Sequence, residues 1–304
     1  MPAFRLARVA LALHVACSGC GDRTPRVERP VFDGSAAIAR VKTQLDFGMR
    51  IPNTAAHVKT GDWIVAQLIP FADTVIVQPF THVTVSGDTL RLRNILARFK
   101  PSAARRVLYL THWDSRPTAE EAKDPAQRTL PTPGANDGAS GVALLIGVAE
   151  ALKQAPPTVG VDLLFVDGED FGDFKVDKDV LLGSRYFAEH LPDSAYAPMF
   201  GVLFDMIGDA DLQLYQEGNS LQQAPEVVAR VWDQAKALGL DAQFRAEAKW
   251  TVTDDHIPLL KKGLRVIDVI DLDYPHHHTP DDTLDKVSTA SLTAVGQVAL
   301  ALLR

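Results

Sequence analysis

The segment VDLLFVDGED, residues 161–170, joins a short apolar run to a cluster of acidic side chains. A run of aliphatic and β-branched residues that ends in Asp-Gly is typical of a buried β-strand followed by a turn. VLYLTHWDSR, residues 107–116, has the same form, because a buried strand over residues 107–111 would deliver His112 and Asp114 at its carboxyl end. Both segments therefore predict strands that end in polar side chains.

Strands and helices alternate along most of the chain. Apolar residues at helical spacing predict helices over residues 35–44 and 54–69, and β-branched or alternating segments over 74–77, 82–85 and 90–99 predict an antiparallel edge. The remaining expected elements are strands over 161–166, 201–207 and 264–270, and helices over 141–153, 181–190, 225–238, 255–262 and 289–302. This order predicts an α/β fold, a three-layer α/β/α sandwich with a mixed, mostly parallel sheet and helices on both faces. Ligands of such sheets bind beyond the carboxyl ends of the strands.

Length and composition narrow the class of protein. A chain of 304 residues with 46% hydrophobic and 23% charged residues can bury a full core, as one large domain or two small ones, and no interior linker is visible. The 31 Lys and Arg against 38 Asp and Glu give a net charge of −7. Together with the lack of a basic run, this balance excludes a nucleic-acid partner.

Residues 1–20 have the composition of an export signal. Arg5 and Arg8 form a positive start, and the apolar stretch over residues 9–16 is too short to span a bilayer. We therefore expect an exported protein of the cell envelope or periplasm.

The two cysteines, Cys17 and Cys20, follow this stretch directly in CSGCGD, where small residues precede a Cys as in a bacterial lipoprotein cleavage site. Ser18 and Gly19 favour Cys20 as the lipidated residue, with Cys17, an ordinary cleaved signal or an uncleaved apolar start as alternatives. Residues 21–34 would then form a tether, and the lipid would be the protein's only contact with a membrane. Cleavage at Cys20 would leave no pair of cysteines for a disulfide.

Two further polar segments complete a set of metal ligands. Asp137 lies in GANDGASG, residues 134–141, and His278 lies in HHHTPDD, residues 276–282. Asp137 alone could equally cap the helix that follows, as could Ser140. Together with the polar ends of the strands, however, these segments offer His, Asp and Glu side chains that suit zinc.

The order of HWDSR, GANDGASG, DGED, LGSRYF, FDMIG, TDDHIPLL and HHTPDDTLDK resembles the zinc aminopeptidase family of bacterial leucyl aminopeptidase. Within this family the chain is most similar to the glutaminyl-peptide cyclotransferases and their bacterial relatives. The resemblance covers residues 35–304. It implies a zinc-exopeptidase-like catalytic domain there, with the N-termini of peptides or proteins as substrates.

The resemblance also implies a zinc site. Asp137, Asp170 and His278 would hold one zinc ion, and Glu169 would be the carboxylate that transfers protons. Because residues 276–278 are all histidines, His277 is an alternative ligand, and only alignment with the family selects His278.

The two branches of the family imply different metal counts. In the aminopeptidase branch a second zinc ion is shared through Asp137 and held also by His112 and Asp205. In the cyclotransferase branch one zinc ion is bound, and Asp205 instead accepts a hydrogen bond from, or donates one to, Asp254 in the substrate site. We expect one zinc ion rather than two.

The resemblance favours a cyclotransferase that forms N-terminal pyroglutamate from glutamine and releases ammonia. The alternatives are a zinc aminopeptidase and an inactive binding protein on the same scaffold. The binding protein is disfavoured because the metal ligands and the base are all present. The chain departs from the cyclotransferases at His277, where a Trp is usual, and in the loop over residues 171–180, which has no Trp. The aromatic side chains that could replace these Trp residues are Phe171, Phe174, Trp113 and Trp250, although core packing is the simpler expectation for each of the two tryptophans.

Overall fold

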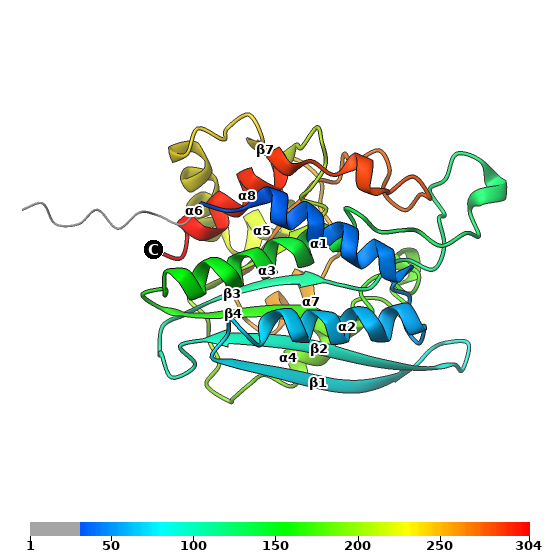
Figure 1. The fold of residues 1–304 in the computed structure, drawn as a ribbon, viewed down its shortest axis with the longest axis horizontal. Helices are drawn as coiled ribbons and strands as arrows, with labels where there is room; N and C mark the ends of the chain where they lie inside the picture. The colour runs from blue at the N-terminus through cyan, green and yellow to red at the C-terminus, as the bar shows by residue number, and fades with distance from the viewer. Residues whose placement is uncertain (1–30) are drawn as a thin grey trace, which may run out of the picture.

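The computed structural model describes residues 31–304 and shows a six-stranded sheet between two layers of helices (Figure 1). The strands lie in the order β1-β2-β4-β3-β5-β8. β3, β4, β5 and β8 are parallel, whereas β2 runs antiparallel to both β1 and β4. The strands are β1 Thr74–Val83, β2 Thr89–Phe99, β3 Arg106–His112, β4 Gly160–Val166, β5 Phe200–Asp205 and β8 Val266–Ile270. The expected three-layer α/β/α fold is confirmed.

Helices cover both faces of the sheet (Figure 1). One face carries α1 Gly34–Phe47, α2 Ala55–Leu68, α3 Ala139–Gln154, α6 Pro225–Ala237 and α8 Thr289–Ala301. The other carries α4 Leu182–Glu189 and α7 His256–Lys261, and α5 Gly218–Gln223 packs beside the edge strand β8. Three short 3₁₀ helices, Pro125–Gln127, Phe174–Val176 and Leu284–Lys286, lie in the connections.

The side chains of the central strand β3 alternate between two hydrophobic cores. Val107 and Tyr109 point into the core beneath α3 and α8, whereas Leu108 and Leu110 point into the core beneath α4 and α7. All seven residues of β3 are buried, as expected for a strand covered on both faces. The polar residues at its end must therefore lie at the rim of the sheet, where the cores stop.

Sequence periodicity located most elements to within a few residues but missed three features. β1 is one strand of ten residues rather than two short ones, with Pro79 tolerated because β1 is an edge strand. The small parallel pair of β6 Leu214–Gln216 and β7 Phe244–Ala248, and the helix α5, were not expected.

The folded body begins slightly earlier than expected. Phe32, assigned to the tether, is 3% exposed and packs against Gly147 of α3 and Gly296 of α8, and Asp33 caps α1. The proposed signal over residues 1–20 and the tether as far as residue 30 lie outside the described residues. Within residues 31–304, none of the helices combines the length and apolar character needed to cross a membrane.

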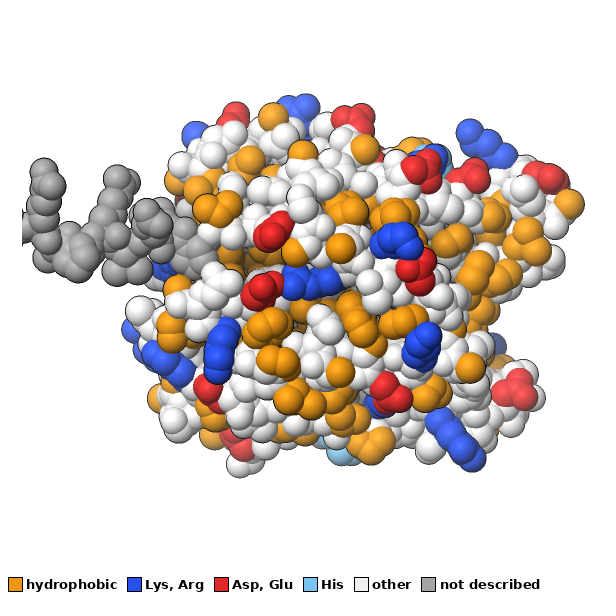
Figure 2. Space-filling view, in the orientation of Figure 1, with side chains coloured by type: hydrophobic (Ala, Val, Ile, Leu, Met, Phe, Trp, Pro, Cys, Tyr) orange, Lys and Arg blue, Asp and Glu red, His pale blue; other side chains and the backbone are white. Residues whose placement is uncertain are grey.

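Charges of both signs are mixed on the surface. On the face shown in Figure 2, the Lys and Arg side chains are interspersed with Asp and Glu side chains, and no broad basic area appears there.

Candidate functional site

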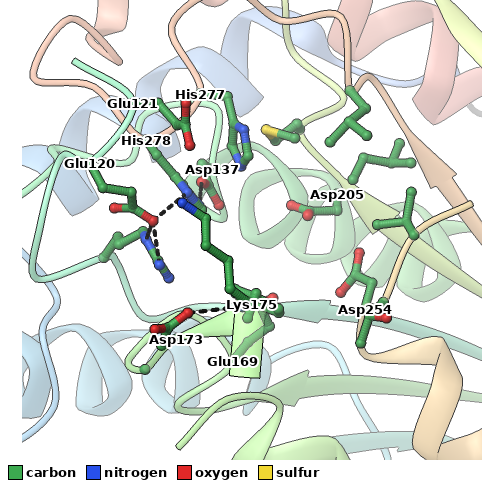
Figure 3. A pocket seen from close by; sticks show the side chains of 18 of the residues that line it. Glu120, Glu121, Asp137, Glu169, Asp173, Lys175, Asp205, Asp254, His277 and His278 are labelled. Atoms are coloured by element: carbon green, nitrogen blue, oxygen red, sulfur yellow. Dashed lines mark hydrogen bonds and ion pairs between the residues drawn. The ribbon is translucent and has the colours of Figure 1, made fainter. Parts of the chain in front are cut away.

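A cavity of about 520 Å³ opens at the carboxyl ends of the parallel strands (Figure 3). Its wall is formed by the loops after β3, β4 and β5, by the segment before α7, and by the loop after β8. Seven acidic residues and two histidines are among those that line it: Glu120, Glu121, Asp137, Glu169, Asp173, Asp205, Asp254, His277 and His278. The polar segments that the sequence singled out therefore meet in one place.

One half of the site brings together His112, Asp137 and Asp205. His112 Nε2 lies 3.0 Å from Asp137 Oδ1 and 3.2 Å from Asp205 Oδ1. Burial opposes protonation of His112, but Asp205 and Glu169 outweigh it and hold the pKa of His112 well above its usual value. All three side chains are buried, so they form a compact donor set for a cation.

The other half brings His278 against two carboxylates. His278 Nε2 lies 3.2 Å from Asp170 Oδ1 and 3.5 Å from Asp137 Oδ2, so Asp137 faces both halves of the site. Glu120 Oε1 lies 3.2 Å from the other ring nitrogen, Nδ1. Burial lowers the pKa of His278, but Asp170 and Glu120 outweigh that effect and raise it to about 10. We call His112, Asp137, Asp170 and His278 the metal cluster.

Asp170 is held by Arg116 as well as by His278. Arg116 donates to Asp170 Oδ1 at 2.8 Å and to the Asp170 carbonyl at 3.1 Å. Burial alone would raise the pKa of Asp170, but His278 and Arg116 lower it to about 2. The other oxygen, Oδ2, is buried and accepts no hydrogen bond from any described residue, so one acceptor of this carboxylate remains unused.

The donor set of the metal cluster fits zinc. Zinc takes His nitrogen and carboxylate oxygen as ligands, and the cluster offers both in a buried setting. A second grouping needs notice, because Asp137, His277 and His278 also place one ligand atom each within 4.8 Å of the others. Burial and the neighbouring His278 lower the pKa of His277 to about 4, which leaves its lone pair available. His277 thus remains an alternative histidine ligand beside His278.

Hydrogen bonds to the backbone hold the loops that carry these ligands. Asp114 accepts the N–H groups of Glu169 and Asp170, each at 3.2 Å, and Gly168 supplies the left-handed turn between strand and ligands with φ 71°. Asp114 Oδ1 also lies 3.6 Å from His112 Nδ1. Its shorter bonds nevertheless go to the backbone.

The loop of Asp137 is held from the other side by Asp282. The two carboxylate oxygens of Asp282 accept the N–H groups of Asn136 at 2.8 Å and Asp137 at 3.2 Å, and Tyr274 donates to the same carboxylate at 2.7 Å. Gly138 is the N-cap of α3 without a side-chain cap bond, so neither Asp137 nor Ser140 caps the helix. The helix-cap alternative for Asp137 was wrong, and its side chain is free to face the cavity.

Sequence reasoning missed Arg50, which is fully buried beside the site. Its guanidinium donates to the carbonyls of Trp113 at 3.0 Å, Gly134 at 2.7 Å and Asp137 at 3.2 Å, and so ties together the loops that carry His112 and Asp137. The only local signal is an arginine in an otherwise unremarkable turn, MRIPNT.

Glu169 and Asp254 also line the cavity (Figure 3), and Glu169 Oε2 lies 3.6 Å from His112 Nδ1. Burial, together with Asp170 and Asp254, raises the pKa of Glu169 well above its usual value, although His112 opposes this. Burial and the nearby Asp205 likewise raise the pKa of Asp254. No hydrogen bond between Asp205 and Asp254 is formed among the described residues, and Asp254 Oδ1 instead accepts the N–H of Asp255.

Of the four aromatic residues proposed for the substrate pocket, the structure places one there. Phe174 lines the cavity beside Arg116, whereas Phe171 packs against Leu90, Leu92 and Leu182. Trp113 is fully buried and stacks on His57 at 4.4 Å, as core packing predicted. Trp250 is 47% exposed, so core packing is wrong for that residue.

Comparison with known proteins identifies the family. The profile of peptidase family M28 matches residues 94–303. This chain belongs to peptidase family M28. The glutaminyl cyclase of Bacteroides thetaiotaomicron, solved with N-acetylhistamine bound, is 35% identical, with a TM-score of 0.87 over 90% of this chain and 98% of that one. A Zn-dependent exopeptidase from Parabacteroides distasonis is 34% identical, with a TM-score of 0.87 over 90% of this chain and 99% of that one.

A relative found by sequence similarity supports the same family assignment. A glutaminyl-peptide cyclotransferase-like protein of Mus musculus is 29% identical over 234 residues, which are 69% of this chain. The match spans 59% of the mouse protein's length. The family and the fold class expected from the sequence motifs are therefore confirmed, and the protein is an enzyme by its family.

Proposed function

We propose that this protein is a zinc-dependent glutaminyl-peptide cyclotransferase, which converts an N-terminal glutamine of a peptide or protein into pyroglutamate and releases ammonia. The observation that carries the proposal is the position of Glu169, a buried carboxyl that lines the cavity directly beside the candidate zinc ligand Asp170. The bacterial glutaminyl cyclases of the same fold and similar length support it.

Asp137, Asp170 and His278 would hold the zinc ion. When bound there, zinc would supply a Lewis acid that polarises the γ-carbonyl of the glutamine side chain. Arg116 and Glu120 would keep Asp170 and His278 in place, since Arg116 donates to Asp170 Oδ1 at 2.8 Å and Glu120 Oε1 lies 3.2 Å from His278 Nδ1.

Glu169 would move the proton. In the reaction the α-amine nitrogen bonds to the γ-carbonyl carbon, the bond from that carbon to the amide nitrogen breaks, and one proton passes from the amine to the departing ammonia. A carboxyl whose pKa is raised by burial is suited to take up that proton and release it within one turnover. Asp205 and Asp254 would position the amide, as both line the same cavity.

The second candidate is a zinc aminopeptidase, in which Glu169 would deprotonate a water molecule that attacks the first peptide carbonyl. The observation that favours it is the complete second donor set of His112, Asp137 and Asp205, whose ligand atoms lie within 4.8 Å of one another. A Zn-dependent exopeptidase among the similar structures supports this alternative.

One experiment separates the two candidates. The purified protein is analysed for zinc per chain and assayed with glutaminyl and leucyl peptides for ammonia and for free amino acids. The cyclotransferase predicts about one zinc ion and ammonia from glutaminyl peptides whose backbone stays intact. About two zinc ions, free amino acids and no ammonia would establish the aminopeptidase instead.

We further propose that the protein is exported and anchored by a lipid on Cys20, a residue outside the described part of the chain. Acylation needs the thiol, so Cys20→Ser should release the protein from the membrane fraction or leave an unprocessed precursor. Unchanged attachment of this variant, with release of Cys17→Ser, would move the lipid to Cys17.

A further inference from the structure

A second groove adjoins the cavity of the candidate site, on the face of the sheet that carries α4 and α7. Its volume is about 570 Å³, and its walls come from the loop after β4, from the segment before α7 and from both helices. Phe174 and Thr253 line the groove and the cavity alike, so the two adjoin at these side chains. We call it the α4–α7 groove, and its other lining residues are Asp177, Leu181, Arg185, Ala188, Glu189, Ile257, Pro258, Lys261 and Lys262.

The α4–α7 groove offers a path for the part of a peptide that does not react. Only the N-terminal residue reacts in either candidate function, so the rest of the peptide must leave the cavity. The volume of the groove falls within the range of about 300–1,000 Å³ in which proteins bind ligands. The half-buried Ile257 and Pro258 provide apolar surface there, against which peptide side chains can pack.

The cavity and the groove differ in charge. Seven acidic residues line the cavity, and Arg116 and Lys175 are the only Lys or Arg among its described lining residues. The groove instead has three cations, Arg185, Lys261 and Lys262, against two acids. The positively charged amino terminus of a peptide is therefore attracted to the cavity rather than to the groove.

The lysines carry the free positive charge of the groove. Arg185 forms an ion pair with Asp177, which cancels its charge. Lys261 and Lys262, at the carboxyl end of α7, are exposed, and their side chains form no hydrogen bond or ion pair with any described residue. Glu189 is the one remaining acid of the described lining, so the groove keeps a positive charge in excess.

We propose that the α4–α7 groove binds the segment of the substrate that follows its N-terminal residue, and that Lys261 and Lys262 select peptides with an acidic side chain in this segment. The proposal rests on the proposed function, because it takes the cavity as the place of the N-terminal residue. Such a peptide is positive at its amino terminus and negative further along, which complements the acidic cavity and the lysines beside it. The chain passes from one to the other between Phe174 and Thr253.

Matched peptides test this with the full-length zinc-loaded protein. Amidated glutaminyl tetrapeptides of alanine carry Glu, Gln or Lys at the second, third or fourth position in turn, and kcat and KM are measured for each. At the position that reaches the lysines, kcat/KM should be roughly 5-fold higher for the Glu peptide than for the Gln peptide, the scale of exposed charge contacts. About 1 M salt should remove this preference, because it screens exposed charges.

The double variant Lys261→Gln with Lys262→Gln should bring the ratio of kcat/KM for the Glu and Gln peptides close to 1. The double variant Lys261→Glu with Lys262→Glu should favour the Lys peptide instead. Both changes should appear in KM rather than in kcat, since the lysines do not line the cavity and contribute to binding alone.

Lys236→Glu is the matched control. Lys236 is also an exposed lysine in the last turn of a helix, α6, but lines neither the groove nor the cavity. Its replacement changes the net charge by the same amount as the double Gln variant, and the ratio should stay that of the wild type. The proposal is overturned by a wild-type ratio near 1 at every position, or by an unchanged ratio in the double variants. An equal change in Lys236→Glu would also overturn it, because the preference would then follow net charge.

Failure of this proposal can be distinguished from failure of the proposed function. The short substrate Gln-Ala-amide carries no charged side chain, and the wild type should release ammonia from it. If free glutamine appears without ammonia, the cyclotransferase proposal fails, and the ratios are then measured as amino-acid release from leucyl peptides with the same downstream residues. If ammonia appears but the ratios stay near 1, only the proposal for the groove fails.

Discussion

The metal cluster and a second group of buried ionisable residues, Asp254, His256, Asp268 and Glu217, which we call the acid cluster, differ in the charge of their carboxyls. In the metal cluster Arg116 and His278 overcome burial and lower the pKa of Asp170 to about 2. In the acid cluster burial and neighbouring carboxylates raise the pKa of Asp254 and Asp268. The neighbours, rather than the residue type, therefore decide whether a buried carboxyl is an anion ready for a metal or an acid that keeps its proton.

The largest effect should follow from breaking the metal cluster. His278→Ala or Asp170→Ala should remove tightly bound zinc and with it the activity, because a site with three protein ligands cannot spare one. Metal content after dialysis, with kcat/KM, measures this. The thermal midpoint should also fall, since an ion bound only by the folded state stabilises it.

His277→Ala is the control for this pair of variants, as it alters the neighbouring ring only. It should keep its zinc. Loss of zinc from His277→Ala, with zinc retained by His278→Ala, would show that His277 is the ligand and that the motif alignment is displaced by one residue.

The next largest effect concerns Glu169, which lines the cavity. Glu169→Gln should keep zinc and fold while activity falls by about 100-fold or more, because the amide cannot accept the proton of the attacking amine. Steady-state kinetics and metal analysis check it. Parallel loss of zinc would make Glu169 a ligand in place of Asp170, and activity near that of the wild type would refute the proton-transfer role.

A smaller effect should appear in the pH dependence of stability, through the one anion of the acid cluster. Burial would raise the pKa of Glu217, but His256 and backbone N–H groups lower it to about 2. Its contribution to stability is therefore complete above the pKa of the unfolded chain, near 4.3, and is lost as the pH falls through the folded value.

Denaturant titration between about pH 5 and pH 2 should show that Glu217→Gln removes about 1–2 kcal/mol of this pH-dependent stability. Glu226→Gln is the control, because Glu226 forms an exposed pair with Arg265 and such pairs contribute little. An unchanged slope in Glu217→Gln would mean that this carboxylate is not stabilised as an anion in the folded state.

The smallest effect should come from His277, at the wall of the cavity. His277 lines the cavity at the position where cyclotransferases usually have a Trp. Among the described residues that line the cavity, Phe174 is the only Phe, Tyr or Trp. His277→Trp should strengthen binding of a glutaminyl peptide by about 1 kcal/mol, the scale of one aromatic contact. The inhibition constant of a non-reacting glutaminyl analogue measures this. Weaker binding would mean that His277 itself contacts the substrate.

Several parts of this arrangement were predictable from local sequence. The strands of the sheet follow from short apolar runs, and the polar residues at their ends follow from the motifs that interrupt those runs, as at His112 and at Glu169 with Asp170. The small β6 and β7 pair was not, because strands of three and five residues give too short a pattern. The folded body also begins earlier than the sequence suggested. Phe32 is buried, but one apolar residue in a polar stretch gives no periodic pattern.

The sequence by itself determined which chemistry the protein can hold, because ligand types, their order and the strand ends that carry them are all local properties. Only the tertiary structure decided how each group is used. Arg50 lies in an ordinary local context, and its importance arises from the loops distant in sequence that its guanidinium joins. Burial and neighbouring charge depend on the whole fold, and these two quantities decide which carboxyl keeps its proton and which is left free to bind a metal ion.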